Sequence, residues 1–108
     1  MSEERIVFLY VTTSSLEEAQ KIGRILLERR LCACVNIYNG VQSMYWWQGK
    51  LESSQEAIMI VKTREGLVEE AERAIRDNHS YTCPCIAKIP VEIPFKAFEE
   101  WLIRETQG

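Results

Sequence analysis

Soft metal-binding side chains lie close together in residues 79–85. His79 is the only histidine of the chain, and Cys83 and Cys85 follow it closely. Thiolate sulfur and imidazole nitrogen together suit copper(I) or zinc. A single histidine just after a helix is equally typical of a hydrogen-bonded structural group or a partner of the helix dipole. Both interpretations of His79 stay open, and on the first of them the predicted metal ligands are His79, Cys83 and Cys85.

The four cysteines fall in two pairs, Cys32-Ala33-Cys34 and Cys83-Pro84-Cys85. Neither pair has the C-x-x-C spacing of a zinc knuckle or a redox dithiol. Side chains two apart in an extended segment share a face, so each pair could present both thiols together. The pattern favours buried cysteines that behave as small hydrophobic residues over a site of four thiolates around one metal ion.

Charged and aromatic residues form a second candidate set. Glu56 and Lys62 flank an otherwise apolar segment. In a strand they would share a face at a separation of about 20 Å, so they cannot pair within it, although either could face a neighbouring subunit. Each alone is typical of a charged residue at a strand end. Large rings bury much surface, so most of the aromatic set should lie in a core or an interface. That set comprises Tyr45, Trp46, Trp47, Tyr81 and Trp101.

Several classes of protein lack their signatures here. The chain has no glycine-rich phosphate loop, no H-E-x-x-H and no G-x-S-x-G. A net charge of −3 argues against a nucleic-acid partner. No apolar run reaches the ~20 residues of a membrane span, so no membrane partner is expected. The acidic start carries no cleavable apolar segment, and cytosolic chains keep their cysteines reduced, so we expect a cytoplasmic protein.

The elements that must position these residues alternate between strands and helices. Apolar and β-branched runs predict strands over residues 5–12, 31–38, 50–63 and 86–89. Amphipathic stripes predict helices over residues 15–30 and 64–78, and a third from Pro94. Ser15 and Glu18 predict a capping box, and Thr63 a cap for the second helix. The order βαββαβ plus a last helix predicts one α+β domain over residues 1–108, with a ferredoxin-like antiparallel sheet and two helices on one face.

The dipeptide Asn39-Gly40 interrupts the second strand and has two interpretations. It is either a two-residue hairpin turn or a bulge in one strand that continues to Trp47. An unbroken strand over residues 31–47 spans about 55 Å, whereas a domain of this size has a radius of gyration of about 13 Å. We therefore expect a bulge and a long hairpin arm that turns at residues 47–50 and projects from the globule. Strands 5–12 and 50–63 are apolar on both faces, so self-association should cover the open face.

The remaining signal is a set of motifs in a fixed order: residues 31–37 (LCACVNI), residues 43–50 (SMYWWQGK), Glu56, residues 61–63, residues 79–81, Pro84 and Trp101. In this combination the chain resembles the CutA divalent-cation tolerance family along nearly its whole length. The resemblance implies a small ferredoxin-like subunit in a tight homotrimer, whose long arms pair strands between subunits. It implies a cytoplasmic protein of divalent-metal tolerance, copper above all, without an established enzyme activity. It also implies that motif residues gather in clefts between subunits, namely Ser43, Tyr45, Trp47, Glu56, Lys62, His79, Tyr81 and Trp101.

Two departures from the family pattern concern the metal ligands. Some members carry a cysteine just after the first strand and a histidine pair before the tyrosine, where this chain has Val11 and Asn78-His79. Cys83 and Cys85 could replace the missing ligands. The leading hypothesis is a trimeric, non-enzymatic protein of copper tolerance that binds a metal ion or a small ligand at its clefts.

Two alternatives belong to other classes of protein. One is a small-molecule sensor, since PII-type regulators are also ferredoxin-like trimers with ligand clefts between subunits. The other is an enzyme that uses Glu56, Lys62, His79 and Tyr81 for acid–base chemistry.

Overall fold

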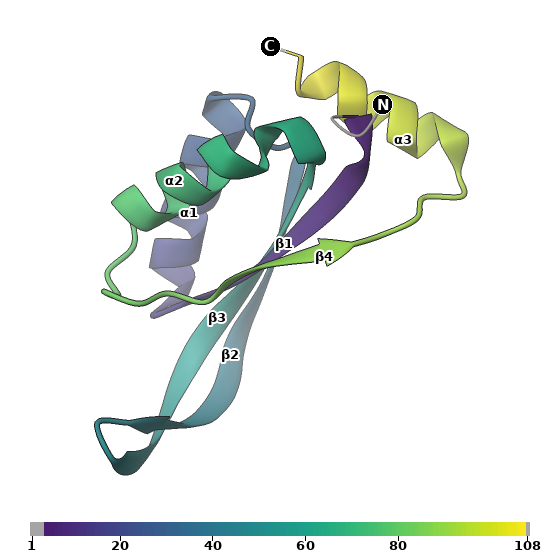
Figure 1. Cartoon of the computed structure of the whole chain (residues 1–108). Helices are drawn as coiled ribbons and strands as arrows, with labels where there is room; N and C mark the ends of the chain where they lie inside the picture. The colour runs from purple at the N-terminus through teal and green to yellow at the C-terminus, as the bar shows by residue number, and fades with distance from the viewer. Residues whose placement is uncertain (1–3, 108) are drawn as a thin grey trace.

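The computed structural model describes residues 4–107. In chain order the elements are β1 (Ile6–Thr13), α1 (Leu16–Glu28), β2 (Cys34–Trp47), β3 (Lys50–Arg64), the 3₁₀ helix η2 (Glu65–Leu67), α2 (Val68–Asp77), β4 (Ile86–Pro90) and α3 (Lys96–Glu105). The strands form one antiparallel sheet in the order β2-β3-β1-β4. This arrangement confirms the predicted α+β, ferredoxin-like fold with a long hairpin arm and an additional C-terminal helix (Figure 1).

The hydrophobic core lies between the sheet and the layer formed by α1 and α2 (Figure 1). Successive side chains of a strand point to opposite faces, so β1 and β3 each give one fully buried row to this layer. The sheet supplies Leu9, Val11, Ala57, Met59 and Val61, and the helices supply Ala19, Ile22, Leu26, Ala71, Ala74 and Ile75. The amphipathic stripes read from the sequence therefore face the sheet, as predicted.

Ser15 caps α1 as predicted, because its Oγ accepts the Glu18 N–H at 3.1 Å. The Glu18 side chain does not return to Ser15, however, but bonds to Ser14, so the box closes one residue earlier than predicted. At the other end Arg30 has φ +57, and this left-handed conformation lets the Leu31 N–H reach the Leu26 carbonyl at 2.9 Å. The turn takes up residues 29–33, so β2 begins at Cys34 rather than at residue 31.

Two predicted helix starts are wrong. Thr63 is fully buried in β3 and its Oγ1 donates to the Leu31 carbonyl at 2.7 Å, so it does not cap a helix. Instead η2 follows β3, and α2 begins at Val68 without a side-chain cap. At the third helix Phe95 is the N-cap with an extended backbone, so Pro94 precedes α3 rather than opening it. At Thr63 a hydrogen bond to a distant residue, and at Phe95 an extended backbone, prevents a helix from starting where the local sequence predicts it.

The strands β2 and β3 form the predicted arm. They pair along its whole length with a register shift between Tyr38 and Val41, where Gly40 has φ +77. A side chain disfavours that φ, and the shift confirms the bulge interpretation. At the tip Gln48 and Gly49 have φ +51 and +80, the two positive values of a type I′ turn. Past the bulge the arm extends away from the body (Figure 1).

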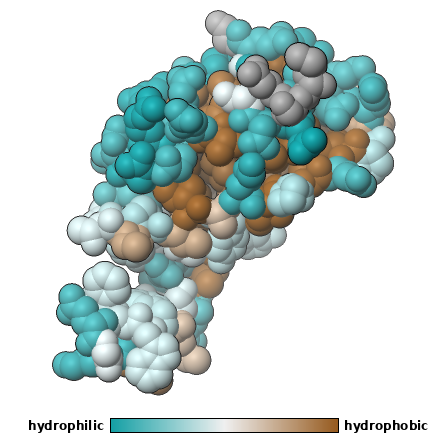
Figure 2. Space-filling model, in the orientation of Figure 1, coloured by the Kyte–Doolittle hydropathy of each residue, from teal (hydrophilic) through white to brown (hydrophobic). Residues whose placement is uncertain are grey.

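The other face of the sheet is only partly covered. α3 lies on this side at one end of the sheet, where Lys62 Nζ of β3 is 5.7 Å from the centroid of the Phe98 ring (Figure 1). Further along, Tyr38 is 66% exposed. Apolar side chains of β1 and β3 on this face are half-buried: Phe8, Tyr10, Ile58 and Ile60. Figure 2 shows hydrophobic surface in the middle of the body, between the helical layer and α3.

Candidate functional site

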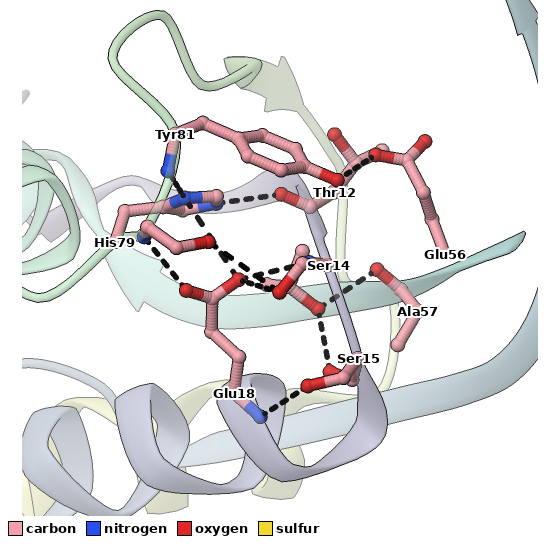
Figure 3. Close-up of polar contacts among 10 residues, drawn as sticks. Thr12, Ser14, Ser15, Glu18, Glu56, Ala57, His79 and Tyr81 are labelled. Carbon is pink, nitrogen blue, oxygen red and sulfur yellow. Dashed lines mark hydrogen bonds and ion pairs between the residues drawn. The ribbon is translucent and has the colours of Figure 1, made fainter. Parts of the chain in front are cut away.

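His79 ties the loop after α2 to the end of β1. The loop spans residues 78–85 and begins with Asn78, whose Nδ2 donates to the Ala74 carbonyl at 2.8 Å. His79 Nε2 lies 2.8 Å from the Thr12 carbonyl oxygen, and the Tyr81 N–H donates to His79 Nδ1 at 3.0 Å (Figure 3). A carbonyl only accepts and a backbone N–H only donates, so Nε2 carries the proton and Nδ1 does not. Both ring nitrogens are thus engaged, in a side chain that is 0% exposed.

Glu18, in the first turn of α1, holds the same loop from another side (Figure 3). Its Oε1 accepts the N–H and the hydroxyl of Ser14 at 2.8 and 2.9 Å, and its Oε2 accepts the Ser80 N–H at 2.7 Å. Burial alone would raise the pKa of the Glu18 carboxyl, but these hydrogen bonds outweigh it and lower the pKa below its ordinary 4.5. Glu18 is therefore an ionised anchor between the start of α1 and the loop.

The loop presents Tyr81 to Glu56 at the base of the arm. Tyr81 Oη donates to Glu56 Oε2 at 2.7 Å, and the Tyr81 and His79 rings pack with centroids 4.9 Å apart. Glu56 is only 8% exposed. Partial burial and the hydrogen bond to this carboxylate raise the pKa of Tyr81 well above its ordinary 10.0, so the phenol keeps its proton. The site thus holds a phenol donor against a buried carboxylate.

A hollow of about 650 Å³ opens beside this pair, and we call it the arm hollow. Its size lies within the range of about 300–1,000 Å³ that is usual for small-molecule sites. The arm, β1 and the loop supply its lining residues, which are Thr12, Ser43, Met44, Tyr45, Trp47, Glu56, Ser80, Tyr81, Thr82, Cys83 and Cys85. The structure therefore brings together the predicted cleft residues Ser43, Tyr45, Trp47, Glu56 and Tyr81 with the predicted ligands Cys83 and Cys85.

Lys62 and Trp101, also predicted for the cleft, lie elsewhere in the chain. Lys62 Nζ is 5.4 Å from the centroid of the Phe8 ring and 5.7 Å from that of Phe98. The Trp101 ring is 5.6 Å from the Phe98 ring. These residues meet where α3 crosses β3, and neither lines the arm hollow. Within one chain the predicted cleft set is therefore divided into two groups.

The arm, the loop and α3 all fall within one family match. The model of the CutA1 divalent ion tolerance protein family matches residues 7–105. This chain belongs to the CutA1 family. Among its CutA1 relatives, the divalent-cation tolerance protein CutA of Archaeoglobus fulgidus is 47% identical over 95 residues, which are 88% of this chain and 92% of that protein.

Comparison with other CutA1 proteins concerns the fold of this chain and its length. A solved structure of the periplasmic divalent cation tolerance protein CutA from Archaeoglobus fulgidus is similar with a TM-score of 0.91 and 44% identity, covering 94% of this chain and 99% of that one. The chloroplastic CutA 1 of Oryza sativa subsp. japonica is 33% identical over 101 residues, 94% of this chain but 57% of that protein. Between residues 4 and 107, no helix of this CutA1 chain is long and apolar enough to cross a membrane.

The predicted metal ligands of this CutA1 chain differ in how accessible they are to a metal ion. Cys83 and Cys85 are exposed and line the arm hollow. His79 is enclosed beneath Tyr81, with both nitrogens in hydrogen bonds. Across residues 4–107 no three His, Cys, Asp or Glu side chains cluster in a way that would hold a metal ion. The ligand set of His79, Cys83 and Cys85 stays a prediction, and it requires His79 to release one of its hydrogen bonds.

The remaining candidate ligands are not available for a metal ion. At the two positions where some family members carry ligands, Val11 has no donor atom and is fully buried inside β1, and the Asn78 amide bonds to its own helix. Burial raises the pKa of the Cys32 thiol to about 12. All four cysteines are free thiols, and Cys32 is the one that is buried. The interpretation as buried cysteines therefore holds for Cys32 and is wrong for the exposed pair Cys83 and Cys85.

Two contributors to this CutA1 site carry no recognisable sequence signal. Glu18 was readable only as a capping residue of α1, because its partner Ser80 lies 62 residues further along the chain. Thr12 contributes its carbonyl oxygen, which every residue has. The capping-box spacing distinguishes Glu18 from the exposed neighbour Glu17, but it indicates a partner at the helix start and not Ser80.

Proposed function

We propose that this CutA1 chain works as a homotrimeric, non-enzymatic protein of divalent-cation tolerance, chiefly toward copper. Its clefts between subunits bind a metal ion or a small ligand. The observation that carries the proposal is the arm hollow, in which aromatic rings, two thiols and a buried carboxylate meet. In addition, the family and its relatives are named for tolerance of divalent cations rather than for a reaction.

Exposed apolar side chains support the assembly of several copies. Met44, Trp46 and Leu51 on the arm are 73%, 74% and 67% exposed. Burying such surface contributes about 25 cal/mol per Å², so a second copy gains stability by covering it. β2 is also an edge strand, whose outer backbone groups are free to pair with another strand. A contact between two different surfaces, repeated three times, closes into a ring.

The same assembly accounts for the divided set of cleft residues. Lys62 and Trp101 lie around Phe98, apart from the arm hollow of their own chain. In a ring, one surface of each copy meets a different surface of the next. We propose that the Lys62 and Trp101 side chains of one copy stand at the rim of the arm hollow of its neighbour, with the Lys62 charge kept over the Phe8 and Phe98 rings of its own copy rather than paired with Glu56.

Cys83 and Cys85 are the proposed copper ligands. They are exposed, two positions apart and in the wall of one hollow. Soft thiolates suit copper(I), and imidazole adds a third ligand of suitable type. His79 completes the set once its hydrogen bond to the Thr12 carbonyl or from the Tyr81 N–H is released.

Light scattering tests the assembly. The wild type is expected at three times 12.6 kDa. Trp46→Lys puts a charge on the exposed apolar surface of the arm and should give lone chains, because burying an unpaired charge is costly. Gln20→Lys, at an exposed position of α1, is the matched control and should remain trimeric. A wild type with the mass of one folded chain contradicts the trimer.

Calorimetric titration of copper(I) under reducing, anaerobic conditions tests the ligands. The wild type should bind with submicromolar affinity, and the double variant Cys83→Ser, Cys85→Ser should lose about tenfold or more. Cys34→Ser, which removes a thiol outside the hollow, is the control. Unchanged affinity in the triple variant His79→Ala, Cys83→Ser, Cys85→Ser rejects this ligand set.

We also propose a cytoplasmic location. All four cysteines are free thiols, as in chains that stay in a reducing compartment. The Archaeoglobus fulgidus CutA protein of known structure is called periplasmic, which concerns that protein and not this chain. Cell fractionation with an antibody against this chain tests the location, and recovery outside the cytoplasm contradicts it.

The arm hollow also favours the second candidate, a small-molecule sensor, because it has the size and aromatic walls of a ligand site. A thermal-shift screen of metabolites tests it, since a ligand that binds the folded state raises the melting temperature.

The enzyme alternative gains no such support. Lys62 lies by Phe8 and Phe98, and both His79 nitrogens are engaged, so one chain does not assemble the acid–base set.

A further inference from the structure

The arm hollow has a lining that selects the charge of its ligand. Among the residues of the described chain that line it, Glu56 is the only charged one, and it is 8% exposed. Within residues 4–107 its carboxylate accepts one hydrogen bond, from Tyr81, and takes part in no ion pair. A carboxylate accepts about four hydrogen bonds, so Glu56 can accept from a ligand as well as from Tyr81. The hollow therefore presents a buried negative charge that lacks a cationic partner in the described chain.

The walls around Glu56 favour an organic cation over a hydrated metal ion. Tyr45, Trp47 and Tyr81 supply aromatic rings, and Met44 a thioether. The faces of such rings attract cations that approach within about 6 Å of the ring centroid. An anionic ligand would be repelled by Glu56, and a neutral ligand would leave the carboxylate unpaired in an apolar site. Rings beside a carboxylate are the arrangement that recognises ammonium groups.

Two cations of β3, Lys50 and Lys62, each stand six residues from Glu56 in the sequence, and neither forms an ion pair with it in the described chain. Lys62 Nζ lies over the rings of Phe8 and Phe98, on the same face of the strand but six residues beyond Glu56 in the sequence. Residues on one face of a strand at this spacing are about 20 Å apart. Lys62 of the same chain therefore does not neutralise Glu56.

We propose that the arm hollow binds a small organic ammonium compound. Its positive nitrogen pairs with Glu56, and its substituents pack against Tyr45 and Trp47. This inference rests on the arm hollow being the ligand site of the proposed function, and it names the class of the ligand. The copper ligands Cys83 and Cys85 belong to the loop wall of the same hollow, so the two kinds of cation use different donor groups.

Choline and its uncharged isostere 3,3-dimethylbutan-1-ol test the proposal, because they differ mainly in charge. Calorimetric titration of the intact protein at constant ionic strength should show about tenfold tighter binding of choline. Glu56→Gln keeps an acceptor for Tyr81 and should remove this preference. Glu52→Gln, an exposed carboxylate on the same strand, should retain it.

Equal affinity of the wild type for the two compounds overturns the proposal, and that comparison needs no variant. A preference that survives in Glu56→Gln also overturns it. If the wild type shows no preference for choline but the Lys62→Met variant does, then Lys62 of a neighbouring copy supplies the cation for Glu56. That result also contradicts the proposal. Light scattering of the same samples separates the two hypotheses. A trimer without the preference contradicts only the ligand class, whereas a lone chain with the preference contradicts only the trimer.

Discussion

The Glu18 carboxylate accepts the backbone N–H of Ser80 at 2.7 Å, although the two residues are 62 positions apart. The same carboxylate bonds to the N–H and hydroxyl of Ser14, so one side chain joins the β1–α1 connection to the loop of residues 78–85. That loop carries Tyr81, Cys83 and Cys85 into the arm hollow, whereas Glu18 does not line it. Glu18 is therefore a positioning residue for the site.

Removal of the Glu18 carboxylate should destabilise the fold and loosen the loop. We expect Glu18→Ala to lower the free energy of unfolding by about 2 kcal/mol, since hydrogen bonds to a charged group each contribute more than neutral ones. Glu17→Ala, at the exposed neighbouring position, should stay within about 0.5 kcal/mol of the wild type. Urea denaturation measures both changes. Equal effects of the two variants would show that the tie to Ser80 adds no stability.

The free energy of unfolding should decrease at acidic pH, in part because Glu18 becomes protonated. The folded pKa of Glu18 is lowered from 4.5, so its contribution is present above that value and is lost as the pH falls through the folded pKa. Glu18→Gln should therefore show a shallower loss of unfolding free energy between about pH 5 and pH 3. Parallel pH profiles contradict this assignment.

Gly23 leaves room that an alanine would fill. A Cβ at this position would lie 3.5 Å from Val35 Cγ1 and 3.6 Å from Met59 Cε, which are ordinary contacts. Glycine inside a helix costs about 1 kcal/mol relative to alanine, so Gly23→Ala should raise the free energy of unfolding by about 0.5–1 kcal/mol. Gly23→Leu overfills the same space and should lower it. Thermal and urea denaturation measure both, and a destabilised alanine variant would show that the helix cannot approach the sheet with a side chain there.

Cys32 should be the unreactive thiol of the chain. Burial raises its pKa to about 12, and thiol reagents attack the thiolate. In a variant with Cys34→Ser, Cys83→Ser and Cys85→Ser, we expect no reaction with dithionitrobenzoate at pH about 8 until guanidinium unfolds the chain. The matched variant that retains Cys83 as its single cysteine should react in the folded state, because that thiol is exposed. Rapid labelling of folded Cys32 would contradict the burial.

Local sequence was enough to predict the fold and the family. Helical stripes, apolar runs and the Ser15 cap act over a few residues, and their periods are set by backbone geometry alone. The bulge at Gly40 and the tip at Gly49 followed from glycines at positions that need positive φ and from the length of the second strand. The set of motifs that resembles the CutA family is confirmed by the family match.

Which of the reactive side chains meet depended on contacts between distant parts of the chain. The Thr63 hydroxyl bonds to Leu31 instead of capping a helix, and His79 bonds to Thr12 across 67 positions. Glu56 meets Tyr81 across 25 positions, whereas Lys62, on the same strand, lies against Phe98. A polar group bonds to the partner that the packed elements bring within about 3 Å, and a partner that far along the chain leaves no trace in a local pattern.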